Sequence, residues 1–269
     1  MSERSAVAVV QFAPRDDTGA NLAAITEHVE RAVARGASLV VLPEYSAYFT
    51  PQPGPDWLEA AQGLGGEFVS ALGALAQQHG IHLVAGFLET SPEPERIYNT
   101  VAAVGPDGTL LATYRKQHLY DAFGSTESQW VAPGALTAPQ TFPWRGFTVG
   151  LQTCYDIRFP EVTRALVDAG ADLVLVPAEW VRGPLKEFHW RTLVTARAIE
   201  NTVFVAAADH APPIGVGNSL IVDPMGVALA SLGEAPDVAV ADLDPARLAE
   251  VRAVNPALEL RRYRVSPRQ

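Results

Sequence analysis

Short apolar runs recur along the whole chain, and the segments that separate them constrain the fold most. Between the runs Val7–Phe12 and Ser38–Leu42, apolar residues recur at helical spacing up to Gly36. A strand, a helix and a strand in this order predict a right-handed crossover between parallel strands. Turn signals at 105–108 and 223–226 instead predict antiparallel hairpins. The mixture predicts large mixed sheets covered by helices, not a purely parallel sheet.

The length and composition fit one large core. The chain has 269 residues, of which 48% are hydrophobic, and it contains no low-complexity segment and no linker that would divide it. We therefore predict one domain over residues 1–269, in which residues 255–269 form an Arg-rich C-terminal arm. A proline-rich loop is expected over 50–55. A long irregular loop is expected from 119 to 134, and a loop of that length is often functional.

The charge and the cysteine count exclude several classes of protein. The net charge is −10 and no Lys/Arg-rich run occurs, which argues against nucleic-acid binding. The single cysteine cannot form a disulfide within the chain and suits a reducing cytoplasm. After Met1–Arg4, the apolar run 6–10 is too short for a signal peptide, and no run approaches the ~18 residues of a membrane span. These features predict a soluble cytoplasmic protein.

Three polar residues stand at the ends of three apolar strands: Glu44, Lys116 and Cys154. If those strands shared a sheet, the side chains would converge at one edge, where open α/β sheets bind ligands. The thiol would attack a carbonyl or nitrile carbon, and the carboxylate would accept its proton and later protonate a leaving amine. The ammonium would lower the pKa of the thiol and hold an oxyanion. Alternatively, each residue is structural or a solvated charge.

The surroundings of Cys154 and Glu44 favour the chemical interpretation. Cys154 lies between a predicted strand that ends at Leu151 and a predicted helix that begins at Pro160. Such a corner presents one side chain at the sheet edge beside free backbone N–H groups. Glu44 follows an apolar strand, and partial burial would raise the pKa of its carboxyl group, although a nearby lysine would oppose that.

Several segments resemble the nitrilase superfamily of carbon–nitrogen hydrolases. Residues 42–45 (LPEY), 114–119 (YRKQHL) and 154–161 (CYDIRFPE) are similar to its three signature regions in order and spacing. Residues 190–201 and 217–226 are similar to later blocks. The resemblance covers essentially the whole chain, from Val7 to the last predicted helix.

The resemblance implies an α/β fold, a four-layer α–β–β–α sandwich with two mixed central sheets, and a site without metal or cofactor. It also implies Glu44 as general base and acid, Lys116 as stabiliser of the intermediate and Cys154 as nucleophile. Glu127 matches a second glutamate of many members and would position Lys116 and the substrate. The backbone N–H of Tyr155 would complete the oxyanion site. A homodimer packed across helices is implied as well, with an arm that often crosses to the partner.

The blocks are most similar to those of small-amide amidases, including ω-amidases and deaminated-glutathione amidases. That similarity implies conversion of a small amide to a carboxylic acid and ammonia through a Cys154 thioester. The loop between Asp121 and Glu127 is shorter than in the ω-amidase type, which leaves the acyl group open. Arg158 or Arg182 could bind a substrate carboxylate. The candidate substrate-binding residues are Tyr45, Tyr120, Phe123, Tyr155, Arg158, Trp180 and Arg182.

Other functions stay open at this stage. An N-carbamoyl amine hydrolase or a nitrilase would use the same triad, and an amine could replace water in acyl transfer. A Cys–His hydrolase would need one of His118, His189 and His210, but no cysteine-protease signature surrounds Cys154. A non-catalytic binding module on the same fold would have an unreactive thiol. The chain contains no HExxH or CxxC pattern, which argues against a metal site.

Overall fold

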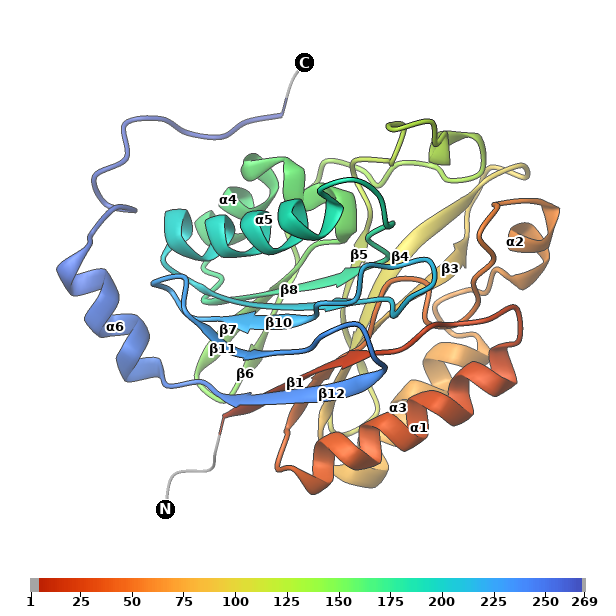
Figure 1. Ribbon diagram of the computed structural model, residues 1–269, viewed down its shortest axis with the longest axis horizontal. Coiled ribbons are helices and arrows are strands. Elements are labelled where there is room, and N and C mark those ends of the chain that lie inside the picture. Colours follow the sequence, from red (N-terminus) through yellow and green to blue (C-terminus); the bar gives the residue numbers. More distant parts are fainter. Residues whose placement is uncertain (1–4, 268–269) are drawn as a thin grey trace.

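Two six-stranded mixed sheets form the centre of the protein in a computed structural model that describes residues 5–267 (Figure 1). The first sheet has the strand order β12-β1-β2-β3-β4-β5 and the second has the order β11-β10-β9-β8-β7-β6. The first consists of β1 (Ala6–Gln11), β2 (Leu39–Val41), β3 (His82–Thr90), β4 (Ile97–Val104), β5 (Leu110–Arg115) and β12 (Asp237–Asp242). The second consists of β6 (Thr141–Trp144), β7 (Phe147–Leu151), β8 (Leu173–Ala178), β9 (Phe204–Asp209), β10 (Leu220–Val222) and β11 (Ala228–Ser231).

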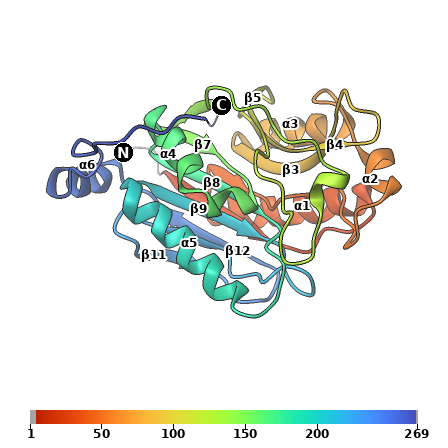
Figure 2. The same cartoon turned by 90° about the horizontal axis from the view of Figure 1, so that it is seen from above.

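Helices cover the outer faces of both sheets, so the layers run α–β–β–α. Helices α1 and α3 lie on the first sheet, and α4 and α5 lie on the second (Figure 2). Helix α6 lies at one end of the sandwich. The helices are α1 (Thr18–Ala34), α2 (Pro55–Ala60), α3 (Glu67–His79), α4 (Pro160–Asp168), α5 (Lys186–Asn201) and α6 (Pro245–Val254). This arrangement confirms the four-layer prediction and forms a single domain.

Alternating side chains along the strands build three apolar layers. Val7 and Val9 of β1 pack between the two sheets, whereas Ala8 and Val10 pack under helices α1 and α3. Strand β8 alternates in the same way on the second sheet. Because both faces of these strands are buried, their sequences read as continuous apolar runs, which is why they could be identified without a structure.

Strand directions agree with the predicted crossovers and hairpins. Strand β1 pairs with β2 in parallel, and β4 pairs with β5 antiparallel across the 105–108 turn. Strands β10 and β11 form the second predicted hairpin. Among the strands and α-helices, two were not predicted: helix α2, which follows the loop expected at 50–55, and strand β6.

The C-terminal arm lies against its own chain where the structure describes it. Leu258 packs against the apolar layer under α4 and α5, and Arg261 forms a 2.5 Å salt bridge with Asp168 at the end of α4. Residues 261–267 have no regular secondary structure and are largely exposed. Residues 268–269 of the predicted arm and residues 1–4 at the other end lie outside the described residues.

Candidate active site

The three predicted catalytic residues meet where the two sheets face each other. Glu44 follows β2 and Lys116 follows β5, both in the first sheet, whereas Cys154 follows β7 in the second sheet. The interpretation that required one shared sheet was therefore wrong. Strand β2 packs against β8, so the carboxyl ends of strands from both sheets adjoin. The site forms across the sandwich, and its geometry depends on how the sheets pack.

Lys116 lies at the centre of a buried cluster of charges. Its side chain is 2% exposed, and its Nζ lies 2.9 Å from Oε1 of Glu44 and 2.9 Å from Oε2 of Glu127. Burial alone would lower the pKa of Lys116, but the two carboxylates outweigh burial and hold it well above its ordinary value. Lys116 is therefore an ammonium ion at neutral pH, fixed between two carboxyl groups.

Glu127 comes from a short 3-10 helix, Glu127–Gln129, inside the long loop predicted from 119 to 134. Its Oε1 accepts a hydrogen bond from the Tyr45 hydroxyl at 2.6 Å, and its Oε2 accepts one from the backbone N–H of Tyr120 at 2.5 Å. Burial would raise the pKa of Glu127, yet Lys116 and these two donors bring it below its ordinary value. Glu127 is thus the ionised carboxylate that balances Lys116.

Glu44 is held by donors from both sheets. Its Oε1 accepts from the Asn99 amide at 2.6 Å, and its Oε2 accepts from the backbone N–H of Glu179 at 2.6 Å. Burial raises the pKa of Glu44; Glu127 raises it further, and Lys116 opposes the rise. The prediction of a raised carboxyl pKa agrees with this direction. Such a carboxyl group exchanges protons more readily near neutral pH, as a general base requires.

Cys154 begins a short 3-10 helix, Cys154–Arg158, with φ at 43°, a conformation that non-glycine residues seldom adopt. Its Sγ lies 3.4 Å from the carbonyl oxygen of Glu179. Burial and the Glu44 carboxyl group raise the pKa of Cys154 well above its ordinary value, although Lys116 acts in the opposite direction. Lys116 lowers the thiol pKa, as predicted, but burial has the larger effect and raises it. The Cys154 side chain at rest is therefore a neutral thiol, and the Glu44 carboxyl group beside it could accept its proton.

Two further contacts fix the loops that carry these residues. Asp156, two positions after Cys154, accepts a hydrogen bond at 2.9 Å from the backbone N–H of His118 and another at 2.8 Å from the Tyr114 hydroxyl. It thereby ties the Lys116 segment to the Cys154 turn. A ring nitrogen of His118 also lies 2.8 Å from Asp156, so this histidine is engaged with Asp156, which weakens the Cys–His alternative.

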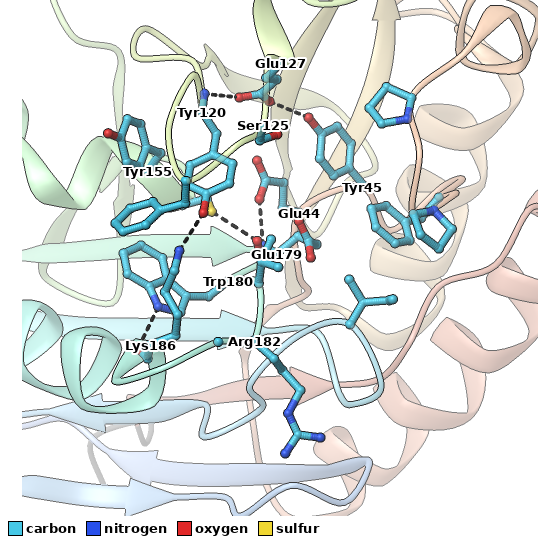
Figure 3. A pocket seen from close by; sticks show the side chains of 18 of the residues that line it. Glu44, Tyr45, Tyr120, Ser125, Glu127, Tyr155, Glu179, Trp180, Arg182 and Lys186 are labelled. Atoms are coloured by element: carbon cyan, nitrogen blue, oxygen red, sulfur yellow. Dashed lines mark hydrogen bonds between the residues drawn. The ribbon is translucent and has the colours of Figure 1, made fainter.

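A cavity of about 780 Å³ opens above the cluster (Figure 3). In Figure 3, Glu44 and Glu179 lie between Tyr45 on one side and Trp180 with Lys186 on the other. Six of the seven predicted substrate-binding residues line it: Tyr45, Tyr120, Phe123, Tyr155, Trp180 and Arg182. Arg158 is not among the lining residues; its guanidinium group lies 4.8 Å from the centre of the Trp180 ring. Arg182 forms a 2.6 Å salt bridge with Glu234.

The sequence reasoning missed three residues of the site: Asn99, Glu179 and Lys186. Asn99 is a fully buried amide in the apolar strand β4, and that contrast could have marked it. Glu179 lines the cavity, and burial raises the pKa of its carboxyl group well above the ordinary value. Lys186 is one of only two lysines in the chain. Its sequence surroundings carry no motif, so only the packing of α5 reveals its position.

Residues 5–267 contain neither a candidate metal-binding cluster nor a helix suited to span a membrane. No group of three or more His, Cys, Asp or Glu side chains there could hold a metal ion. None of the helices in that range combines the length and the apolar character that a membrane span requires.

Comparisons with known proteins agree on one family. Residues 6–253 match the family model described as carbon-nitrogen hydrolase. A deaminated glutathione amidase of Escherichia coli O157:H7 is 38% identical over 96% of this chain and 97% of its own length. The human omega-amidase NIT2 is 33% identical over 95% of this chain and 94% of its own length. The crystal structure of Saccharomyces cerevisiae Nit3, described as a member of branch 10 of the nitrilase superfamily, aligns with a TM-score of 0.84 and 29% identity, over 98% of each chain.

Proposed function

Because this chain belongs to the carbon–nitrogen hydrolase family, we propose that it hydrolyses a small amide to a carboxylic acid and ammonia with Cys154 as the nucleophile. One observation carries the proposal: the Glu44 carboxyl group, the Lys116 ammonium group and the Cys154 thiol line a single cavity. This set supplies a base, an electrostatic stabiliser and a nucleophile.

The first half of the proposed reaction forms a thioester. The Cys154 sulfur attacks the amide carbon while Glu44 accepts the thiol proton, so no free thiolate has to exist in the resting enzyme. The C–O double bond becomes an oxyanion, which Lys116 and the backbone N–H of Tyr155 stabilise. Glu44 then returns the proton to the nitrogen, the C–N bond breaks, and ammonia leaves.

The second half repeats the proton transfers with water. Water attacks the thioester carbon as Glu44 accepts one of its protons, and the C–S bond then breaks as Glu44 protonates the sulfur. Glu127 remains ionised throughout, because its interaction with Lys116 favours the carboxylate. Its role is to hold Lys116 in place and to keep the charge of the cluster low.

The names of the relatives favour amides over nitriles. Relatives named deaminated glutathione amidase and omega-amidase match over nearly the whole chain. A cavity of about 780 Å³ is larger than a simple primary amide needs, so the substrate carries further groups. N-Carbamoyl amines and nitriles remain the alternatives that the same three residues could process.

An ammonia-release screen tests this function. The substrates are small neutral amides, dicarboxylic monoamides, N-carbamoyl amines and nitriles, each assayed with the native chain and with Cys154→Ala. We expect hydrolysis of at least one amide class and none in the variant. Release from nitriles alone, or no release from any amide, would contradict the proposal.

We also propose a cytoplasmic homodimer. The single cysteine is free, and a reducing compartment keeps such a nucleophile in the thiol form. Four exposed apolar residues support a dimer: Ile199 on α5, and Met225, Val227 and Leu229 in and around the β10–β11 hairpin. The hairpin reaches α5 at Gly226, beside Ile199.

A further inference from the structure

The chain contains two lysines, and both line the same cavity. Lys116 is paired with Glu44 and Glu127, as described above. Lys186, the first residue of α5, is 6% exposed and forms no salt bridge with any carboxylate in the described part of the chain. A buried cation without an anion is costly. An anion bound in the cavity beside Lys186 would therefore offset the cost of burying its charge.

Aromatic side chains hold Lys186 in place. Its Nζ donates a 2.6 Å hydrogen bond to the Tyr120 hydroxyl, and it lies 4.1 Å from the centre of the Phe123 ring and 5.6 Å from that of Trp180. An ammonium group has three donors, and the hydrogen bond to Tyr120 uses one of them. Figure 3 shows Lys186 beside Trp180, on the side of the cavity opposite Tyr45.

The groups that act on Lys186 include a second cation, Arg158, and the Glu179 carboxyl group. Burial lowers the pKa of Lys186, and Arg158 lowers it further. The Cys154 and Glu179 side chains act in the opposite direction. Burial raises the pKa of the Glu179 carboxyl group, and this group forms no salt bridge with Lys186 in the described part of the chain.

We propose that Lys186 is the specificity-determining residue that binds an anionic group on the acyl part of the substrate, with a carboxylate as the simplest case. The inference rests on the proposed amide hydrolysis and names the substrate group that this site selects. The carboxylate would accept hydrogen bonds from Lys186, and the chain between it and the amide would lie against Phe123 and Trp180. Lys186 thus replaces the two arginines predicted for this role, since Arg158 does not line the cavity and Arg182 already pairs with Glu234.

A kinetic comparison tests the selection. Succinamate and butyramide differ mainly in that a carboxylate replaces a methyl group. Lys186→Met should lower kcat/KM for succinamate by roughly 10- to 100-fold, the size expected for a lost charged hydrogen bond, and chiefly through KM. Butyramide turnover should change far less, and Lys186→Arg should retain most of the succinamate preference. An equal loss for both amides, or a loss of preference in Arg182→Met but not in Lys186→Met, would overturn the inference.

A binding measurement separates this inference from the proposed function. Reductive ¹³C-methylation preserves the lysine charge and gives few NMR signals, because the chain has only two lysines. In Cys154→Ala protein, saturating succinate should raise the pKa of the methylated Lys186, whose signal is identified by its loss in Lys186→Met. A raised Lys186 pKa in succinate, without amide turnover by the native chain, would support the anion site and contradict the proposed hydrolase function. Amide turnover with no change in the Lys186 pKa would contradict only the anion site.

Discussion

At the scale of single residues, the same lysine has different consequences for its two carboxyl neighbours. Lys116 lies 2.9 Å from both Glu44 and Glu127, yet the pKa of Glu127 is lowered and that of Glu44 is raised. Hydrogen bonds from the Tyr45 hydroxyl and the Tyr120 backbone N–H stabilise the ionised form of Glu127 and so help to lower its pKa. Two nearby carboxyl groups with pKa values pushed apart are a pattern typical of acid–base assignments in active sites.

The raised pKa of Glu44 leads to a pH prediction. A general base must be deprotonated in the free enzyme, so kcat/KM should fall as the pH drops through the pKa of Glu44. The acidic limb of the profile should therefore have its midpoint above 4.5, the ordinary value for this side chain. Glu44→Gln should lose at least ~10²-fold in kcat. An acidic limb at or below 4.5 would contradict the assignment of Glu44 as the base.

The pKa of the Cys154 thiol should move in opposite directions when Glu44 and Lys116 are each replaced by a neutral residue. Glu44 raises the pKa of Cys154 and Lys116 lowers it. Iodoacetamide labelling followed against pH should thus show a thiol that titrates above 9 in the native chain, at lower pH in Glu44→Gln and at higher pH in Lys116→Met. If neither substitution moves the titration, the three groups do not act on one another. A thiol that titrates below 9 in the native chain would contradict the burial described here.

At the scale of elements, the candidate site lies at strand ends, and the neighbouring strand β3 packs closely against the turn that carries Glu44. A Cβ atom on Gly86 of β3 would lie 2.6 Å from Cα of Glu44 and 2.8 Å from the backbone nitrogen of Tyr45. The backbone of Gly86 also hydrogen-bonds to this turn, since Ser46 N–H donates to its carbonyl oxygen at 2.7 Å. Strand β3 therefore positions Glu44 although it carries no side chain of the site.

Substitution of Gly86 by alanine should displace Glu44. We expect Gly86→Ala to cost about 1–3 kcal/mol of unfolding free energy through overpacking, measured by urea denaturation. It should also reduce kcat by about 10²-fold through misplacement of the base. Gly65→Ala is the matched control, because a Cβ there meets no atom within 4 Å. Equal activity in the two variants would show that β3 does not set the position of Glu44.

The sequence predicted the elements whose patterns are local and missed those set by distant packing. Strands β1, β2 and β8 are continuous apolar runs because both of their faces are buried. Strand β6 escaped prediction because it contains Pro143, which a strand tolerates at the edge of a sheet, where β6 lies. Helix α2 has only six residues, too few for a helical pattern.

At the scale of the whole molecule, the candidate site exists because two sheets are packed face to face. Glu44 and Lys116 were identified from strand ends, but the contact between the Glu44 carboxyl group and the backbone N–H of Glu179 joins residues 135 positions apart. No pattern of residue spacing in the sequence could have predicted this contact. The same is true of Lys186, whose side chain reaches Tyr120 across 66 positions.

The apolar surface on α5 leads to a prediction about assembly. The side chain of Ile199 lies next to Gly226, and Met225 and Val227 beside it are also exposed. If this surface forms the proposed dimer interface, Ile199→Glu should shift the protein from dimer to monomer in sedimentation equilibrium. Leu110→Glu, on the edge strand β5, is the control and should remain dimeric. A native chain that sediments as a monomer would refute the proposed dimer.

The most direct test of the central claim is whether the acyl group of an amide becomes attached to Cys154 during turnover. A reaction quenched in acid within the first turnovers can be digested and its peptides weighed by mass spectrometry. The peptide containing Cys154 should gain the mass of the acyl group less one hydrogen, and Cys154→Ala should neither gain this mass nor release ammonia. Sustained ammonia release by Cys154→Ala, or an acyl group found on another residue, would show that Cys154 is not the nucleophile.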